Sequence, residues 1–264
     1  DRLLEMENLS VPPAPGLPPL FNIEMARLKS GDRVAIVGRN GCGKSSLMRL
    51  IWQQFADESA ESGLKIHPRV SPGYYDQTLH QLPDDATLLD ALEPFAPDPQ
   101  NRKMALIGAG FPWTRHGQTV STLSGGERSR LLFVGLTLAR YSLLMLDEPT
   151  NHLDMEGKEA LAQTLQQFEG GVLLVSHDRQ LISQSCNRFW LIEEGKLSEW
   201  HDAEAVFERL RESAGLATST APVIDTAAVQ PSPYDDLLER LVALETLLED
   251  DLARKPKHQK PHLQ

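Results

Sequence analysis

Two acidic residues, Asp147 and Glu148, directly follow the apolar run at residues 143–146. Such a run predicts a buried strand, so the two carboxylates stand where that strand leaves its sheet. One carboxylate at this position can bind Mg²⁺, and the other can take a proton from an attacking water. Because acidic pairs also occur in turns and at helix starts, the pair alone leaves a purely structural interpretation open.

A glycine-rich segment earlier in the chain supplies the other half of this chemistry. It fits the pattern G-x-x-x-x-G-K-[ST] and stands between a strand pattern at 33–37 and a helix pattern at 45–55. In such a loop, backbone N–H groups face a polyphosphate, the lysine neutralises its β and γ oxygens, and the serine hydroxyl binds Mg²⁺. The residues predicted to bind the phosphates are Gly38, Asn40, Gly41, Cys42, Gly43, Lys44, Ser45 and Ser46.

The loop and the acidic pair together predict a nucleoside triphosphatase. Asp147 would complete the ligands of the Mg²⁺ held by Ser45, directly or through water. Glu148 would orient or deprotonate the attacking water, and Lys44 would stabilise charge on the γ-phosphate.

Two further polar residues stand at predicted strand ends. Gln77 follows the strand pattern at 70–75, where its amide could reach both the metal and the attacking water. His177 follows the strand pattern at 172–175 and could donate to the γ-phosphate as negative charge builds there. Either residue alone is more often a solvated surface residue, but the phosphate loop favours a catalytic role. Gln77 is therefore predicted as a metal ligand with Ser45 and Asp147, and as a catalytic residue with His177.

The segment Ser124, Gly125, Gly126 and Glu127 has two compatible interpretations. Ser and Glu at this spacing predict a capping box at the start of a helix. Two consecutive glycines are not needed for a cap, and they leave a bare helix N-terminus that an anion can approach closely. The segment therefore predicts a second anion site, separate from the phosphate loop.

The elements around these motifs predict an α/β fold. Strand and helix patterns alternate along the chain, which is typical of a mostly parallel sheet covered on both faces. A proline-rich loop at 11–19 separates two alternating strand patterns near the N-terminus, and 78–139 predict a small helical subdomain. We expect a nucleotide-binding domain at 1–213.

The C-terminal part of the sequence changes in character. Residues 214–233 are rich in Ala, Thr, Ser and Pro and predict a flexible linker. Residues 234–264 predict an amphipathic helix followed by a basic tail, which could contact RNA but is more often solvated. The apolar positions of that helix are Tyr234, Leu237, Leu241, Leu244 and Leu248, and the tail carries Arg254, Lys255, Lys257 and Lys260.

Composition limits the alternatives. The 264 residues contain no apolar run near the roughly 18 that a membrane span needs, so we expect no direct membrane insertion. Two cysteines, Cys42 and Cys186, form no disulfide framework and favour a reducing cytoplasm. The net charge of −11 disfavours indiscriminate nucleic-acid binding. Because the chain begins at Asp1 without a methionine, we expect it to be a piece of a longer protein.

The motifs in this order resemble the ATP-binding cassette superfamily over about residues 1–212. Glu127 in the signature and the run from Asp147 to Asp154 look like its ABC-F branch, most like the C-terminal cassette of a twin-cassette protein. The resemblance implies a P-loop domain with an N-terminal antiparallel β-subdomain, a RecA-like parallel core and a small helical subdomain. It also implies Mg²⁺ as cofactor, ATP as substrate, and the ribosome or another RNA-containing partner.

The resemblance further implies that two cassettes pack head to tail, each ATP lying between one phosphate loop and the other signature. Ser124, Gly125, Gly126 and Glu127 would then serve the partner's ATP, and Asp154 would lie at the interface. The second cassette could be another copy of this chain or a different one. One cassette would therefore supply two half-sites and no complete site.

Three departures from that family stand out. No aromatic residue precedes Phe21, where the family usually stacks adenine, so base specificity is open. The chain holds one cassette, whereas ABC-F proteins normally hold two, and the segment 77–124 is too short for a protruding helical arm. Two alternatives remain at this level: an ATPase subunit of a transporter with a separate membrane-spanning partner, and a non-catalytic interaction module.

Overall fold

The computed structural model describes residues 1–58, 61–75, 82–151 and 153–219. The chain divides into a compact unit Asp1–Leu216 and a second unit Ala217–Gln264. Every strand that the structure describes belongs to the first unit, and so does every described candidate site residue. No helix among the described residues is long and apolar enough to cross a membrane. Gln77 and the predicted C-terminal helix and tail lie outside the described residues.

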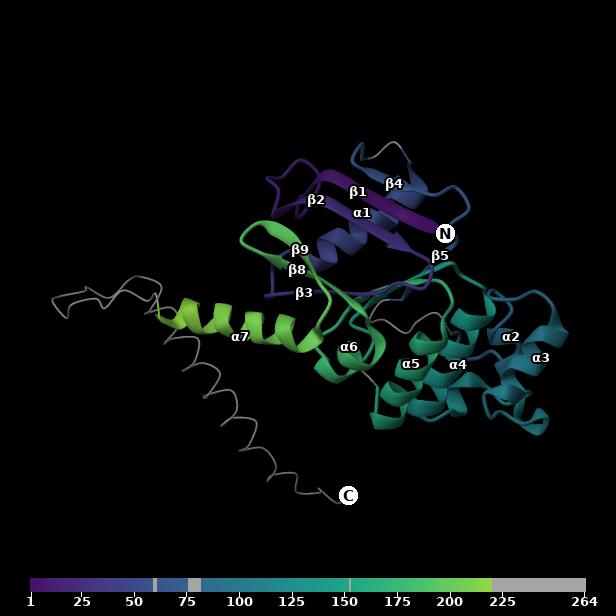
Figure 1. The fold of residues 1–264 in the computed structure, drawn as a ribbon. Coiled ribbons are helices and arrows are strands. Elements are labelled where there is room, and N and C mark those ends of the chain that lie inside the picture. The colour runs from purple at the N-terminus through teal and green to yellow at the C-terminus, as the bar shows by residue number, and fades with distance from the viewer. Residues whose placement is uncertain (59–60, 76–81, 152, 220–264) are drawn as a thin grey trace, which may run out of the picture. The chain divides into compact units, whose positions relative to one another are not determined.

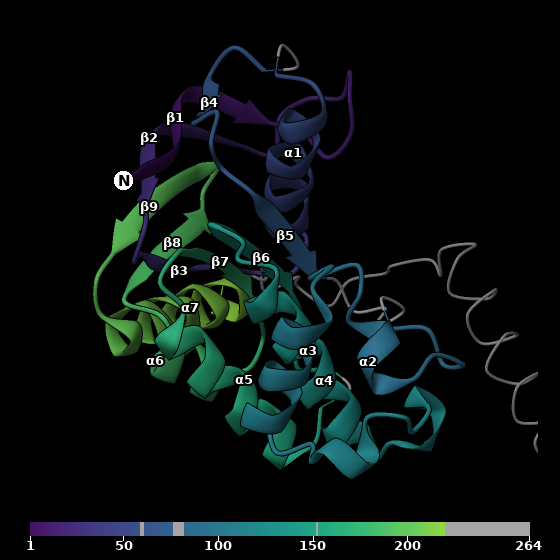
Figure 2. The same cartoon turned by 90° about the vertical axis from the view of Figure 1, so that its right-hand side faces the viewer.

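The described strands form one nine-stranded sheet in the order β4-β1-β2-β9-β8-β3-β7-β6-β5 (Figure 1; β6 and β7 are labelled in Figure 2). Its centre is parallel, since β8, β3, β7, β6 and β5 all run in the same direction. The bounds are β1 Arg2–Val11, β2 Phe21–Lys29, β3 Arg33–Gly38, β4 Leu64–Ile66, β5 Pro72–Tyr75, β6 Leu143–Asp147, β7 Gly171–Val175, β8 Arg188–Glu193 and β9 Lys196–Trp200.

The N-terminal part of the sheet is antiparallel, as expected. Strand β1 pairs antiparallel with both β2 and β4, and β8 and β9 form an antiparallel hairpin. Its turn uses Glu194 and Gly195, both with positive φ, which suits a tight two-residue hairpin. Strand β2 meets β9 at the single pair Asn22 and Lys196, so the antiparallel part continues the central sheet rather than forming a separate one.

The central strands are apolar throughout because helices or strands cover both of their faces. In β3, Val34 and Ile36 point into one core, whereas Ala35 and Val37 point into the other. The same alternation runs along β6 and β7. Two apolar layers thus hold the strand ends, and the loops that follow them, in fixed positions.

Helix α1 (Lys44–Ala56) occupies the inside of the curled sheet, where it contacts β1, β3, β4 and β6 (Figure 2). The opposite core takes apolar side chains from all the other helices. These are α2 Leu88–Ala91, α3 Pro99–Gly108, α4 Gly125–Leu138, α5 Met155–Gln167, α6 Arg179–Ser185 and α7 Ala203–Ser219, with short 3-10 turns at Trp113–Arg115 and Val120–Thr122. Helices α2, α3 and α4 fall within the predicted helical subdomain.

Two helices were not expected from the sequence. Helix α6 begins after Asp178, whose carboxylate accepts from the Leu181 N–H at 3.0 Å. Helix α7 buries Val206 and Phe207 and runs to Ser219, so the linker predicted from residue 214 is helical through 219. Tertiary packing of its first turns, together with Ala and Leu at 214–217, extends the helix beyond the predicted boundary.

Candidate active site

Adjacent parallel strands bring the predicted site residues to one edge of the sheet. Strands β3, β7, β6 and β5 are neighbours in that order, so their carboxyl ends stand side by side. The phosphate loop leaves β3 at Gly38, His177 follows β7, and Asp147 with Glu148 ends β6. Open α/β sheets bind ligands at this edge, because the loops there face a common crevice.

The phosphate loop has a conformation that requires its glycines. Gly41 and Gly43 have φ of 80° and 115°, which disfavours other residues. A Cβ on Gly43 would also lie 2.8 Å from the Phe21 ring. The Lys44 Nζ donates to the carbonyl oxygens of Gly38 at 2.8 Å and Arg39 at 3.1 Å, which holds the ammonium inside the loop.

A pocket of about 460 Å³ opens beside this loop. Its lining includes two of the catalytic residues predicted at strand ends, Glu148 and His177, together with six of the eight predicted phosphate-binding residues: Asn40, Gly41, Gly43, Lys44, Ser45 and Ser46. Cys42 is half-buried, and burial raises the pKa of its thiol above the ordinary 9.0 although nearby Lys44 lowers it. The thiol is therefore protonated at neutral pH and serves as a small packing group in the loop.

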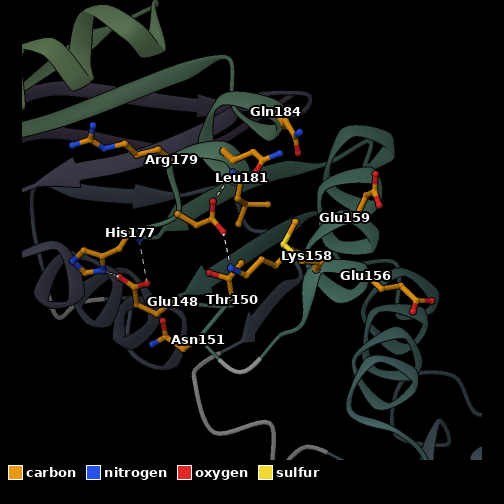
Figure 3. A pocket seen from close by; sticks show the side chains of 13 residues that line it. Glu148, Thr150, Asn151, Glu156, Lys158, Glu159, His177, Arg179, Leu181 and Gln184 are labelled. Carbon is orange, nitrogen blue, oxygen red and sulfur yellow. Dashed lines mark hydrogen bonds and ion pairs between the residues drawn. The ribbon is translucent and has the colours of Figure 1, made fainter.

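Glu148 and His177 form the contact at the centre of the site. The Glu148 side chain is buried, at 7% exposure, and its Oε1 lies in ion-pair contact with His177 Nδ1. Its Oε2 accepts from the His177 backbone N–H at 3.3 Å, so one residue holds both carboxylate oxygens (Figure 3). The other ring nitrogen, Nε2, lies 2.8 Å from Asn40 Oδ1. His177 thus connects the predicted base to the phosphate loop.

The backbone of Glu148 is strained. Its φ of 48° lies in the left-handed region, which costs a non-glycine residue about 1–3 kcal/mol. The Glu148 N–H donates to the Val175 carbonyl at 2.7 Å, which fixes the turn at the end of β6 against β7. Packing and this hydrogen bond hold the carboxylate in a conformation that the isolated segment would avoid.

The donors around Asp147 and Ser45 suit a hard divalent cation. Asp147 ends β6 and accepts from the Tyr74 hydroxyl at 3.4 Å, and Ser45 is exposed in the first turn of α1. Carboxylate and hydroxyl oxygens are ligands that Mg²⁺ uses when substrate phosphates supply the remaining ones. Among the described residues, no three His, Cys, Asp or Glu side chains form a metal cluster. The residues present fit Mg²⁺ delivered with a nucleotide.

The signature segment forms the predicted capping box. Ser124 Oγ accepts from the Glu127 N–H, and Glu127 Oε1 accepts from the Ser124 N–H, both at 3.2 Å. Arg115 contacts the other Glu127 oxygen at 2.6 Å, and its hydrogen bond lowers the pKa of that carboxyl below the ordinary 4.5. Nothing lies within 4 Å of a Cβ placed on Gly125, so the N-terminus of α4 is open to a ligand.

The signature and the phosphate loop of the same chain do not line a common pocket among the described residues. None of its four residues lines either pocket that borders Lys44. Asp154 lies beside the signature instead, because a Cβ on Gly126 would stand 3.0 Å from its Oδ2. The Asp154 carboxylate also caps α5 by accepting from the Gly157 N–H at 2.8 Å. The signature and the loop that follows Glu148 are therefore in contact within one chain.

A larger hollow of about 830 Å³ lies on the other side of Glu148 and His177. Its walls come from the starts of α5 and α6, and Figure 3 shows Lys158, Glu159 and Gln184 around it. It holds no phosphate-loop residue, so its size does not make it the nucleotide site. Glu148 and His177 line both spaces and separate them.

The fold and the site together define a P-loop nucleotide-binding domain of the ATP-binding cassette type. A family model described as "ABC transporter" matches residues 21–151. The ATP-binding protein Uup of Escherichia coli is 34% identical over 242 residues, which cover 85% of this chain and 38% of that protein. ABC transporter F family member 2 of Arabidopsis thaliana is 38% identical over 184 residues, covering 69% and 27% respectively. The chain belongs to the ATP-binding cassette superfamily, and several of its relatives by sequence are ABC-F proteins.

Solved structures agree on the fold. The structure of cbiO1 from Clostridium perfringens, part of the ABC transporter complex cbiONQ, superposes with a TM-score of 0.64 at 21% identity. The match covers 85% of this chain and 97% of that one. By contrast, the chain spans only 38% of Uup and 27% of the Arabidopsis protein, so those relatives are much longer.

Proposed function

We propose that this chain is an Mg²⁺-dependent ATPase cassette that works with a second cassette and acts on the ribosome. The observation that carries the ATPase part is the pocket in which the phosphate loop, Glu148 and His177 meet. Family membership supports hydrolysis as the reaction, and the oxygen ligands at Ser45 and Asp147 support Mg²⁺. The domain division into a cassette at 1–213, a linker and a C-terminal helix remains part of the proposal.

In this mechanism the loop N–H groups and Lys44 hold the β and γ phosphates. Glu148 accepts the proton of the attacking water, because its buried carboxylate stands at the pocket wall. His177 orients that carboxylate through two contacts and presents its ring to the γ-phosphate. Mg²⁺, when bound by Ser45, Asp147 and Gln77, would neutralise charge on the β and γ oxygens.

The second anion site, predicted at the N-terminus of α4, is the reason for proposing a partner cassette. The bare N-terminus of α4 at Gly125 faces open space and can bind the phosphates of an ATP held by another cassette. The contact between Gly126 and Asp154 then connects that ATP to the loop behind Glu148. Closure of two cassettes would complete both sites, and hydrolysis would reopen them. We place Asp154 at this interface and the whole assembly in the cytoplasm.

The ribosome is proposed as the partner because the ABC-F resemblance implies it. Glu148→Gln should bind ATP without hydrolysing it and so remain closed. We expect this variant to sediment with purified ribosomes in the presence of Mg-ATP and to stay in the supernatant with Mg-ADP. Lys44→Ala, which should bind neither nucleotide well, is the matched control and should stay in the supernatant throughout. Copurification with a membrane complex instead of ribosomes would favour the transporter-subunit alternative.

A further inference from the structure

Arg115 is a charged residue that contacts the signature and that the proposed mechanism does not use. It ends the 3-10 turn Trp113–Arg115, and its Nη1 lies 2.6 Å from Glu127 Oε2. Its Nε donates to Gln118 Oε1 at 3.0 Å, and its guanidinium carbon lies 5.7 Å from the centre of the Phe111 ring. Three contacts therefore hold the guanidinium beside the signature.

The ion pair between Arg115 and Glu127 contributes little to the stability of the fold. Their side chains are 32% and 23% exposed, and ion pairs near the surface stabilise weakly because water and salt screen both charges. The capping box does not require a charge at position 127 either, since Gln makes the same hydrogen bond to the Ser124 N–H. The effect of Arg115 must therefore be sought in the charge of Glu127 itself.

Glu127 places a negative charge where the phosphates of the partner's ATP are proposed to bind. Gly125 and Gly126 are the first two residues of α4, and helix geometry leaves their N–H groups without an acceptor in the helix. In the same turn, Glu127 Oε1 accepts from the Ser124 N–H, and the Arg115 hydrogen bond lowers the pKa of that carboxyl, so it is ionised at neutral pH. An uncompensated carboxylate here would repel a triphosphate and oppose the favourable field of the helix.

We propose that Arg115 is a positioning residue that acts through Glu127: it neutralises this carboxylate and so allows the signature to bind the partner's ATP. The inference rests on the proposed function, because it takes those phosphates to lie at the N-terminus of α4. Arg115 contacts Oε2, whereas Oε1 stays on the Ser124 N–H, so the charge is compensated without breaking the capping box. A glutamate is thus compatible with an anion site.

The test is a double-mutant cycle on phosphate release at saturating Mg-ATP, in a preparation of the full chain whose wild type hydrolyses ATP. Arg115→Gln is expected to lower the rate by about tenfold at low ionic strength, because it leaves the Glu127 charge uncompensated. Adding Glu127→Gln to that variant is expected to restore the rate to within about twofold of the wild type. Arg115→Lys keeps the charge and should retain most of the activity. The loss in Arg115→Gln should shrink as salt is added, because salt screens the carboxylate.

Arg128→Gln is the matched control. Arg128 follows Glu127 on α4 and is also ion-paired, but its partner is Asp84, which lies outside the signature. This variant removes the same charge and one ion pair of the same helix, and it leaves the contact between Arg115 and Glu127 in place. It should therefore release phosphate at the wild-type rate.

Three results would overturn the inference. The first is a wild-type rate in Arg115→Gln. The second is a loss that Glu127→Gln does not restore, which would assign the effect to the packing of Arg115 on Phe111. The third is an equal loss in Arg128→Gln, which would indicate a general need for positive charge on this helix.

Gly125→Asp separates these results from a failure of the proposed function, because it introduces a carboxylate at the N-terminus of α4 directly. If Gly125→Asp is inactive while Arg115→Gln keeps the wild-type rate, the signature binds the partner's ATP and only the role of Arg115 is wrong. If Gly125→Asp also hydrolyses ATP at the wild-type rate, the second half-site itself is wrong.

Discussion

Glu148→Gln is expected to lower the rate of ATP hydrolysis by about 10²- to 10⁴-fold, the usual contribution of a general base. The amide cannot accept the water's proton, yet it keeps the shape of a side chain that is buried and held by His177. Nucleotide affinity should therefore change little. Phosphate release at saturating Mg-ATP measures the first effect, and equilibrium binding of a labelled ATP measures the second.

The control for this substitution is Glu159→Gln. Glu159 lines the larger hollow on the far side of Glu148 and is exposed on α5. The Glu159→Gln variant should therefore hydrolyse ATP at the wild-type rate. If Glu148→Gln hydrolysed ATP at the wild-type rate, in a preparation that turns over ATP, Glu148 would not be the general base. Equal losses in both variants would point to a general effect of charge at this edge.

Lys44→Ala is expected to weaken nucleotide binding by about 10- to 100-fold, because charge-assisted hydrogen bonds contribute about 1.5–3 kcal/mol each. The Lys44 ammonium lies within the loop, where two carbonyl oxygens hold it. The change should also weaken the binding of inorganic tripolyphosphate, which offers phosphates to the loop without a base or a ribose. Titration with labelled ATP and competition with tripolyphosphate measure both effects.

Lys65→Ala is the matched control for Lys44→Ala, because it also removes one lysine. Lys65 is exposed on β4 and lines none of the pockets described, so nucleotide affinity should stay at the wild-type value. Thermal unfolding without nucleotide should be similar for both variants, because Lys44 bonds only to carbonyls of a surface loop. Nucleotide affinity in Lys44→Ala equal to that of the wild type would contradict the assignment of the phosphate loop.

Much of the fold follows from the sequence because its central strands are buried on both faces. The apolar runs at β3, β6 and β7 can be recognised as buried strands from the sequence. The motifs at the ends of these strands then lie at one edge of a parallel sheet. Helices α6 and α7 were missed although their caps were visible. Asp178 and Asp202 both accept hydrogen bonds from the first turn of the helix that follows them.

Contacts between distant segments could not be predicted in the same way. The pairing of His177 with Asn40, and that of Glu127 with Arg115, depends on how loops from different elements meet. The positive φ of Glu148 is likewise imposed by packing against β7 and has no signature in residue type. The proline-rich loop was predicted as a loop, but the sequence does not show that Pro13 and the neighbouring Leu20 line the same pocket as the phosphate loop.

The central claim is that one chain supplies two half-sites, and mixing two inactive variants tests it most directly. Lys44→Ala removes the phosphate loop's cation and leaves the signature intact. Gly125→Asp places a carboxylate at the N-terminus of α4, where open space accepts it and the helix field favours it, but where it repels a phosphate. Gly125→Asn is the neutral control and should retain more activity than Gly125→Asp.

In a preparation whose wild type hydrolyses ATP, each variant alone should be nearly inactive. An equal mixture should recover about a quarter of the wild-type rate, since half of the random pairs are mixed and each has one intact site of two. The decisive measurement is phosphate release from that mixture. Recovery near this value supports composite sites, whereas a mixture as inactive as its components would show that each chain carries its own complete site.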